Sequence, residues 1–283
     1  MPKNLEEIEF TIFDTETTGL DPASGDRIVE IAAVRFKDKK KIASFETFVN
    51  PGRPISEAAF QVNRITQEML KNAPAMGTVL PRFLDFIQGS CLCSYNAGFD
   101  LEFLNNELNL LGKPSLQDIV TVDILRMARR LLPGLERYAL WFVSERLGIN
   151  ITQKHRALAD VEMTWEVFRR FTGILQSKGI TDFEHFSQLF AINAHFLESA
   201  TNQKLAQIQE AIDLGVKLKI KYLSSSGAEV TEREVIPKEI KQESSRSYLV
   251  GFCCLRNDER TFRVDNMLRL EILNESEKGK FAV

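Results

Sequence analysis

The order in which the apolar patterns change along the chain limits its fold more than any other feature. Three segments read as strands before any helix is indicated, at residues 7–14, 27–37 and 42–49. Periods of three and four residues then indicate helices at 66–71, 79–88, 101–111, 122–131, 137–147 and 157–171, around a short apolar strand at 91–94. Strands first and helices interleaved later predict an α/β domain with a mixed sheet flanked by helices.

The pattern changes again after residue 172. Gly173, Ser177 and Gly179 interrupt the helical period, so we expect a domain boundary within 172–183. One or two amphipathic helices are expected at 182–213, and short strands at 216–222, 229–236, 247–254, 260–264 and 268–273. Strands at this spacing are typical of a small β-barrel. The expected division is a first domain at 1–173, a helical linker at 174–205 and a second domain at 206–283.

The composition narrows the functional classes only a little. The length of 283 residues favours two domains, and a formal net charge of −3 does not indicate a nucleic-acid binder. Any positive charge used for such binding must therefore be local or supplied by bound cations. The N-terminal stretch lacks the pattern of a signal peptide, and no apolar run approaches the roughly 18–20 residues that span a membrane. We expect a cytoplasmic protein with no membrane partner.

The cysteines give no sign of a metal site or a disulfide framework. Four are present, as the pairs Cys91/Cys93 and Cys253/Cys254, and neither pair has the spacing of a zinc site. Both pairs fall in apolar runs that read as strands. We expect reduced, buried thiols.

The first acidic pair lies at the end of the first predicted strand, in the run Phe13-Asp14-Thr15-Glu16-Thr17-Thr18-Gly19. Side chains alternate faces along a strand, so Asp14 and Glu16 point the same way. Two adjacent carboxylates repel unless a cation lies between them, and hard cations such as Mg²⁺ or Mn²⁺ prefer carboxylate oxygens. A bare pair of this kind is more often two exposed acids. The threonines and glycine that follow favour a ligand, because they let backbone approach it closely.

A second and a third acidic position follow in motifs of their own. Asp100 ends the run Asn96-Ala97-Gly98-Phe99-Asp100 near the start of a predicted helix, where an aspartate also serves as an ordinary helix cap. Asp160 lies in the helix after His155. If both were helical they would lie about 140° apart, since each residue turns the helix by about 100°. We therefore expect His155 on the loop before the helix, free to reach a site.

Together these motifs resemble the DEDD exonucleases of the histidine subgroup (DEDDh), a family of ribonuclease H-like fold that includes epsilon-type proofreading exonucleases. The resemblance covers roughly residues 7–172 and rests on the runs DTETTG, NAGFD and HRALAD. Asp123 also matches an acidic position of the family, which we interpret as structural. Tyr95 stands where many relatives carry histidine before the asparagine.

The resemblance implies a metal-dependent 3′→5′ exonuclease that releases nucleoside 5′-monophosphates with two Mg²⁺ or Mn²⁺ ions. Asp14 would bridge both ions, Glu16 and Asp160 would complete the site of the ion that carries the attacking water, and Asp100 would serve the second ion through water. A pair of ions of this kind stabilises both the attacking and the leaving oxygen. His155 would act as general base, for which an ordinary histidine pKa of about 6.5 is suitable. The expected contacts to the terminal nucleotide are Thr15, Thr17, Asn96 and Phe99.

The second domain resembles the WYL domain, a small SH3-like or Sm-like barrel thought to bind nucleic acid or a nucleotide-like ligand. Its signature tripeptide reads Ser247-Tyr248-Leu249 here, so the tryptophan is missing, and Asn266 stands where relatives often carry arginine. Four residues match the family's basic and aromatic positions: Arg233, Tyr248, Arg260 and Arg263. Arginine beside an aromatic ring suits single-stranded nucleic acid. The alternative is a structural barrel with solvated arginines, since 206–275 holds 11 Lys/Arg against 12 Asp/Glu.

Other functions remain open from the sequence. DNA is the expected substrate, but an exoribonuclease would carry the same motifs, because contacts to the 2′-hydroxyl are not visible in a sequence. A ligand-sensing regulator would use the second domain as its working part, although no helix-turn-helix is evident before residue 172. A third possibility is a replicative proofreading subunit. Ser187–Phe190 faintly resembles a sliding-clamp peptide, but it falls in a helical apolar stripe, which favours packing.

Overall fold

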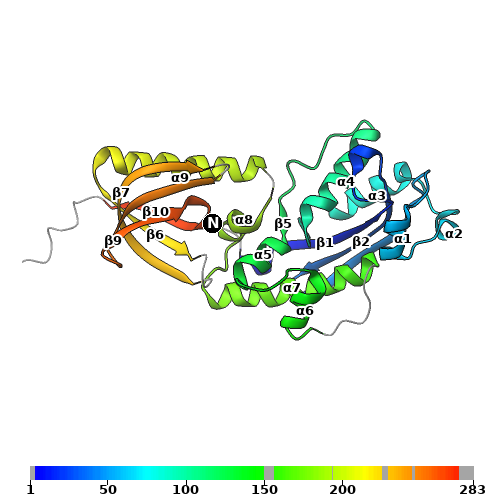
Figure 1. The fold of residues 1–283 in the computed structure, drawn as a ribbon, viewed down its shortest axis with the longest axis horizontal. Coiled ribbons are helices and arrows are strands. Elements are labelled where there is room, and N and C mark those ends of the chain that lie inside the picture. Colours follow the sequence, from blue (N-terminus) through cyan, green and yellow to red (C-terminus); the bar gives the residue numbers. More distant parts are fainter. Residues whose placement is uncertain (1–3, 150–155, 193, 225–228, 244–245, 274–283) are drawn as a thin grey trace, which may run out of the picture.

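The computed structural model describes residues 4–149, 156–192, 194–224, 229–243 and 246–273, without the side chains of 194–200. Two bodies lie side by side (Figure 1). The first is built on a mixed sheet of order β3-β2-β1-β4-β5. Its strands are β1 (Glu9–Thr17), β2 (Ile28–Lys37), β3 (Lys40–Phe48), β4 (Cys91–Ser94) and β5 (Thr121–Asp123). The three-stranded meander is antiparallel, whereas β4 pairs parallel to β1 and β5 parallel to β4. The predicted mixed sheet is confirmed.

Helices cover both faces of this sheet (Figure 1). They are α1 (Glu57–Asn63), α2 (Gln67–Leu70), α3 (Met76–Ile87), α4 (Ala97–Leu110), α5 (Ile124–Leu131), α6 (Leu140–Arg146) and α7 (Ala157–Ser177). Phe10 and Ile12 of β1 pack toward α5 and α7, while Phe13 packs on the opposite face with α3 and α4. Because strand side chains alternate, Asp14 and Glu16 must face the α7 side and Thr15 the α4 side. The polar end of β1 therefore faces α7 on one side of the sheet and α4 on the other.

The second body is a five-stranded antiparallel sheet of order β10-β6-β7-β8-β9, packed against α9 (Ala194–Leu214) (Figure 1). Its strands are β6 (Lys217–Leu223), β7 (Val230–Glu243), β8 (Arg246–Cys253), β9 (Asp258–Arg263) and β10 (Met267–Leu273). Among the described residues β9 and β10 do not pair, so this sheet is open. Closure into a barrel stays a prediction.

Helix α8 (Phe183–Phe190) belongs to the packing of the first body. Its residues Phe186, Leu189 and Phe190 are fully buried in the same apolar cluster as Phe10 and Phe168, and that cluster also takes in side chains of β6 and β10. The predicted preference for packing over a sliding-clamp peptide agrees with this burial. The apolar core is therefore continuous between the two bodies.

Three sequence predictions differ from the structure. The helix expected to break near Gly173 continues as α7 to Ser177, because Thr172 and Leu175 bury their side chains and outweigh the glycine cost of about 1 kcal/mol. Helix α1 was not predicted. Cys254 is exposed, unlike Cys91, Cys93 and Cys253, because it follows the last residue of β8 into a turn. Within the described part of the chain, no helix is both long and apolar enough to cross a bilayer.

Truncation of Phe186 to alanine should lower the free energy of unfolding by about 3–5 kcal/mol, because a fully buried phenylalanine leaves a large cavity. Leu255→Ala is the matched control, since Leu255 is 60% exposed and its loss should change stability by about 0.5 kcal/mol or less. Denaturant unfolding followed by fluorescence and circular dichroism measures both. Equal stabilities of the two variants would contradict the continuous core.

Candidate active site

Three carboxylates meet at the end of β1. Asp14 and Glu16 point from the strand toward α7, whose first turn carries Asp160. One oxygen from each of the three side chains lies within 4.8 Å of the others, and all three residues are half-buried. Asp14 and Glu16 therefore share a face, as predicted. Asp160 is distant from them in sequence and is brought to them by the packing of α7 on β1 and β2. Oxygen ligands at this spacing fit a hard divalent cation.

Asp100 lies beside this cluster but is held by a separate set of hydrogen bonds. Its Oδ1 accepts from the Thr15 backbone N–H at 3.0 Å and from the Thr15 hydroxyl at 2.7 Å, and its Oδ2 accepts from Ser94 Oγ at 2.6 Å. The residue is 3% exposed. These bonds fix α4 to the end of β1 and occupy both carboxylate oxygens of Asp100.

Burial raises the pKa of Asp14, Glu16 and Asp100, and repulsion from neighbouring carboxylates adds to the effect at Asp14 and Glu16. Burial raises the pKa of Asp14 well above its ordinary value, and the charges of Asp100 and Glu16 add to the effect. Burial, then the charges of Asp160 and Glu30, raise the pKa of Glu16 to about 8. Burial also raises the pKa of Asp100 to about 6, against the hydrogen bonds from Ser94 and Thr15. A divalent cation removes this penalty, because it stabilises the ionised forms.

Two buried glutamates attach the helices that carry the acids to β2. Glu30 of β2 accepts both guanidinium N–H bonds of Arg156, at 2.8 and 3.3 Å, and the backbone N–H of Ala157, the first residue of α7. Glu107 of α4 accepts two bonds from Arg27, at 2.7 and 2.6 Å. Charge-assisted bidentate bonds of this kind are strong and directional. They hold α7 and α4 against the repulsion between Asp160, Asp100 and their neighbours.

The turn before α4 is fixed from the edge strand. Asn96 adopts a left-handed conformation with φ of 69°, and its backbone N–H donates to Asp123 Oδ1 at 3.1 Å. The same oxygen accepts from Leu125 N at 2.9 Å and so caps α5. Asp123 therefore has the structural position that the sequence suggested, between α5 and the turn that leads to Asp100.

A pocket opens beside Glu16, with a volume of about 630 Å³. Three of the four residues predicted to contact the terminal nucleotide line it, namely Thr15, Thr17 and Phe99. Asn96 does not line it. The prediction missed Leu20, Val62 and Asn63, of which Leu20 is 84% exposed and Val62 51%. The sequence signal of Leu20 and Val62 was only apolar character in a loop and in an unpredicted helix, and Asn63 gave no signal, so this wall of the pocket could not be predicted.

Position 19, after the acidic strand, requires glycine for a different reason from the one expected from the sequence. A Cβ at Gly19 would lie 2.1 Å from Asp26 Oδ2, so any side chain there would displace that carboxylate. Asp26 accepts from the Thr18 hydroxyl at 2.9 Å and from the Asp21 backbone N–H at 3.2 Å. The absence of a side chain at Gly19 therefore lets the loop close over the Asp26 carboxylate. Both residues form part of the pocket wall.

The remaining predicted residues are distributed differently. His155 lies outside the described residues. Arg263 forms a bidentate pair with Asp265 and lines a cavity between the two bodies, whereas Arg260 is exposed near Asp258. Arg233 stacks over the Phe262 ring and donates to Thr231. Tyr248 lies opposite Arg263 in the β8–β9 ladder but does not line that cavity. The four residues expected in the second domain therefore do not form a single pocket.

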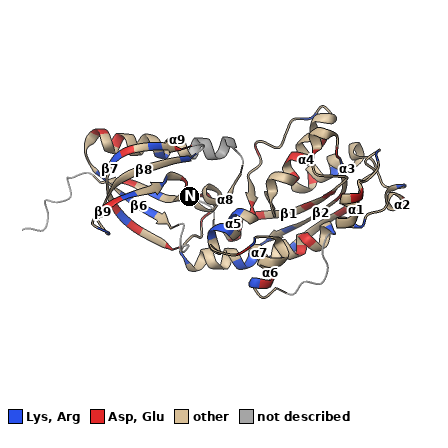
Figure 2. Cartoon of the chain, in the orientation of Figure 1, with Lys and Arg blue, Asp and Glu red and all other residues tan. Residues whose placement is uncertain are grey.

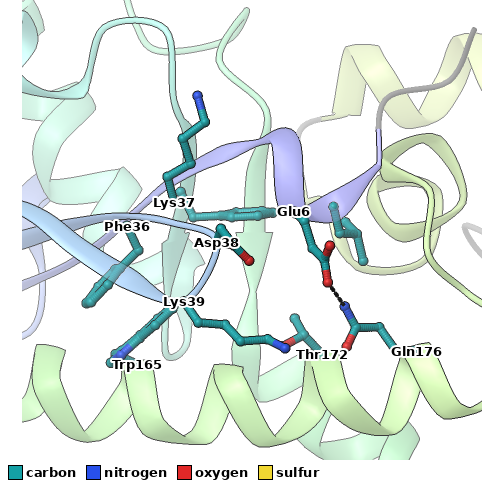
Figure 3. A pocket seen from close by; sticks show the side chains of 10 residues that line it. Glu6, Phe36, Lys37, Asp38, Lys39, Trp165, Thr172 and Gln176 are labelled. Atoms are coloured by element: carbon teal, nitrogen blue, oxygen red, sulfur yellow. Dashed lines mark hydrogen bonds between the residues drawn. The ribbon is translucent and has the colours of Figure 1, made fainter.

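A second small cavity lies away from the carboxylates, between the β2–β3 turn and α7 (Figure 3). Glu6 accepts a hydrogen bond from Gln176 beside it, and Trp165 stacks on Phe36 at its edge. Its volume of about 30 Å³ leaves room for roughly one water molecule. A cavity of this volume is too small for a nucleotide.

The fold and the carboxylate cluster together define a nuclease of the ribonuclease H-like class. The chain matches the family RNase_T, described as Exonuclease, over residues 11–168, which is more than half of its length. It belongs to this exonuclease family. A second match, to the WYL domain, covers residues 203–272.

Curated relatives agree with this assignment. The chain is 43% identical to the DNA polymerase III subunit epsilon of Treponema pallidum over 165 residues, covering 58% of this chain and 76% of that protein. It is 42% identical to a DNA polymerase III subunit epsilon-like protein of Rhodobacter capsulatus over 183 residues, 63% of this chain and 26% of that protein. A DNA polymerase III PolC-type protein of Caldanaerobacter subterraneus subsp. tengcongensis is 32% identical over 92% of this chain and 18% of its own length. The chain thus spans about a quarter or less of these last two.

Solved structures share the fold. Escherichia coli exonuclease I in complex with a dT13 oligonucleotide superposes with a TM-score of 0.58 at 19% identity, covering 87% of this chain and 55% of that one. A 3′-exonuclease solved for 3′-end-specific recognition of a histone mRNA stem-loop gives a TM-score of 0.55 at 18% identity, covering 68% and 74%. At these identities the likeness concerns the fold alone.

The stability of the metal-free protein should fall as pH rises through the window set by Glu16. The unfolded chain releases this proton near pH 4.5 and the folded protein near pH 8, so between them the folded state binds more protons and the free energy of unfolding decreases with pH. Mg²⁺ or Mn²⁺ replaces those protons, so its stabilising effect should grow over the same window. Thermal unfolding with EDTA or with cation, across this range, measures it.

Glu16→Gln is the informative comparison for that experiment, because the amide cannot ionise and should lose most of both the pH dependence and the cation stabilisation. A cation effect on the wild-type protein that does not change with pH would contradict the carboxylate cluster as its source.

Replacement of Glu30 by glutamine should lower the free energy of unfolding by about 1–3 kcal/mol, because the start of α7 loses a buried charged acceptor. The cation affinity of the cluster should fall with it, since Asp160 then loses its fixed place. Isothermal titration with Mn²⁺ measures the affinity. Glu162→Gln, on the same helix but 59% exposed, is the control and should leave both quantities unchanged.

Proposed function

We propose that the chain is a divalent-cation-dependent 3′→5′ exonuclease that acts on DNA and releases nucleoside 5′-monophosphates. The observation that carries the proposal is the cluster of Asp14, Glu16 and Asp160, of which Glu16 also lines an open pocket. Membership of the exonuclease family and the likeness to subunits named for DNA polymerase III favour DNA as the substrate. The chemistry at phosphorus is the same for RNA, so strand type enters the test below.

The protein residues have separate roles in this proposal. Asp14, Glu16 and Asp160 hold two Mg²⁺ or Mn²⁺ ions, with Asp100 acting on the second through water. When bound, the cations supply the positive charge that stabilises the attacking and leaving oxygens and makes the water acidic. His155 takes the proton of that water. The water oxygen would bond to phosphorus while the bond from phosphorus to the 3′ oxygen of the preceding nucleotide breaks. That 3′ oxygen would take up a proton from solvent to become a hydroxyl, and a nucleoside 5′-monophosphate would leave.

The pocket gives the terminal nucleotide its place. Leu20, Val62 and Phe99 offer apolar surface on which a base can stack, and Thr15 and Thr17 line the side toward Glu16. Stacking on apolar and aromatic side chains is sequence-tolerant, since every base has a π-face. A pocket of this composition therefore suits an exonuclease that degrades strands regardless of sequence.

We also propose the domain division 1–173, 174–205 and 206–283 as the functional one, with the second domain closing into an SH3-like or Sm-like barrel. In this proposal the second domain holds nucleic acid or a nucleotide-like ligand through Arg233, Tyr248, Arg260 and Arg263. The exposure of Arg260 and the position of Arg263 on a cavity support such contacts.

Replacement of Asp14 or Asp160 by alanine should reduce hydrolysis at least about a thousandfold, because several kcal/mol of charge stabilisation are lost and each 1.36 kcal/mol is a factor of ten. The measurement uses 5′-labelled and 3′-labelled single- and double-stranded DNA and RNA with Mg²⁺ or Mn²⁺. A ladder from 5′-labelled strands with immediate release of a labelled mononucleotide from 3′-labelled strands reports 3′→5′ polarity. Wild-type-like activity in either variant would refute the assignment.

His155→Ala should lower kcat by about 10²–10⁴-fold with a much smaller effect on KM, which is the range for loss of a general base. His185→Ala is the matched control, because His185 binds Asp182 on α8, away from the carboxylates. A defect confined to KM would argue against the role of His155 as a base.

A further inference from the structure

A cavity between the two bodies is lined by an excess of arginine. It has a volume of about 630 Å³ and receives Arg126, Arg129 and Arg130 from α5 together with Arg246 and Arg263 from the second body. Two acids, Asp123 and Asp265, line it as well, which leaves three positive charges in excess. Figure 2 shows the basic segment of α5 at the junction with the second body. A chain with net charge −3 thus concentrates cations at one interdomain cleft.

Part of this charge serves to hold the bodies together. Asp265 pairs with Arg263 at 2.6 Å, with Arg130 at 3.0 Å and with Arg126 at 3.6 Å. One carboxylate therefore pairs with three guanidinium ions and leaves part of their positive charge uncompensated. Burial lowers the pKa of Arg130 to about 10 and also lowers that of Arg126, as expected for cations that are desolvated more than they are paired.

Four of the polar lining residues keep unpaired atoms or charges within the described residues. Arg130 Nη1 and Asn266 Oδ1 are buried there without a hydrogen bond, and Asn266 is 2% exposed. Arg129 and Arg246 lie exposed and make no ion pair with any described acidic residue. Buried polar atoms are ordinarily satisfied, so unpaired ones beside a polar cavity are available to bind water or a ligand there. The cleft offers paired cations at its floor and free cations at its rim.

We propose that this cleft binds a phosphate-bearing ligand, either a free nucleotide or the sugar-phosphate backbone of a strand, with residues of both bodies. Guanidinium groups match phosphate through bidentate hydrogen bonds, and Asn266 adds an amide for a sugar or base. The site deepens the role proposed for the second domain, but half of it belongs to the exonuclease domain. It is separate from the carboxylates, so binding here can fail while hydrolysis persists, and the reverse.

Asp123 connects the cleft to the catalytic domain. It lines the cavity and at the same time accepts the Asn96 N–H in the turn that leads to Asp100. A ligand phosphate that binds Arg126 or Arg129 would therefore lie next to Asp123.

Fluorescence anisotropy and calorimetry on the full chain test the site, with Asp14→Asn and EDTA present to prevent hydrolysis. The probes are a labelled oligothymidylate and thymidine triphosphate. The double variant Arg129→Gln/Arg246→Gln should weaken binding of at least one probe tenfold or more, since it removes the two free cations. For the oligonucleotide, the slope of log K against log salt should decrease by about 1.4, at about 0.7 for each phosphate contact with a single strand. Thermal unfolding should stay unchanged.

Arg170→Gln/Arg256→Gln is the matched control. It removes the same charge, one arginine from each body, at exposed positions that do not line the cleft. Loss confined to thymidine triphosphate would identify a nucleotide site, and loss confined to the oligonucleotide would identify a strand contact. Equal affinities of both double variants for both probes would overturn the proposal.

Discussion

Repulsion between closely spaced carboxylates is the constraint on which the first domain depends. Asp14, Glu16 and Asp160 lie close together, and the charges of Asp160 and Asp100 raise the pKa of both Asp14 and Glu16. Such a group persists only if its backbones are fixed by something stronger. Here β1, α4 and α7 are held by two apolar clusters, one on each face of the sheet, and by two ion pairs with buried glutamates, Glu30 with Arg156 and Glu107 with Arg27. The fold thus maintains a site that is complete only with a cation.

The acids could be found from sequence because each sits in a short motif whose local geometry is simple. Alternation along a strand was sufficient to put Asp14 and Glu16 on one face. The supporting pairs could not be found in this way. Glu30 lies within an apolar strand and is separated by 126 residues from Arg156, while Arg27 and Glu107 are 80 residues apart. No local pattern links such partners.

The sequence was least informative where tertiary packing outweighs local propensity. Gly173 has a poor intrinsic preference for helix, yet α7 continues through it because the neighbouring turn is buried. The pocket wall from Leu20 and Val62 required a helix too short to show a period. Matching residues in the second domain also proved dispersed, since residues that align with a family motif need not converge on one cavity.

The apolar cluster that runs from β1 through α8 to β6 and β10 has a consequence for how nucleic acid is handled. Two bodies joined by a flexible linker would adopt many distances from each other. Two bodies that share buried side chains are held at one distance. If the second body holds a strand as proposed, that strand would reach the carboxylate cluster over a fixed distance, and strands shorter than this distance could not contact both sites at once.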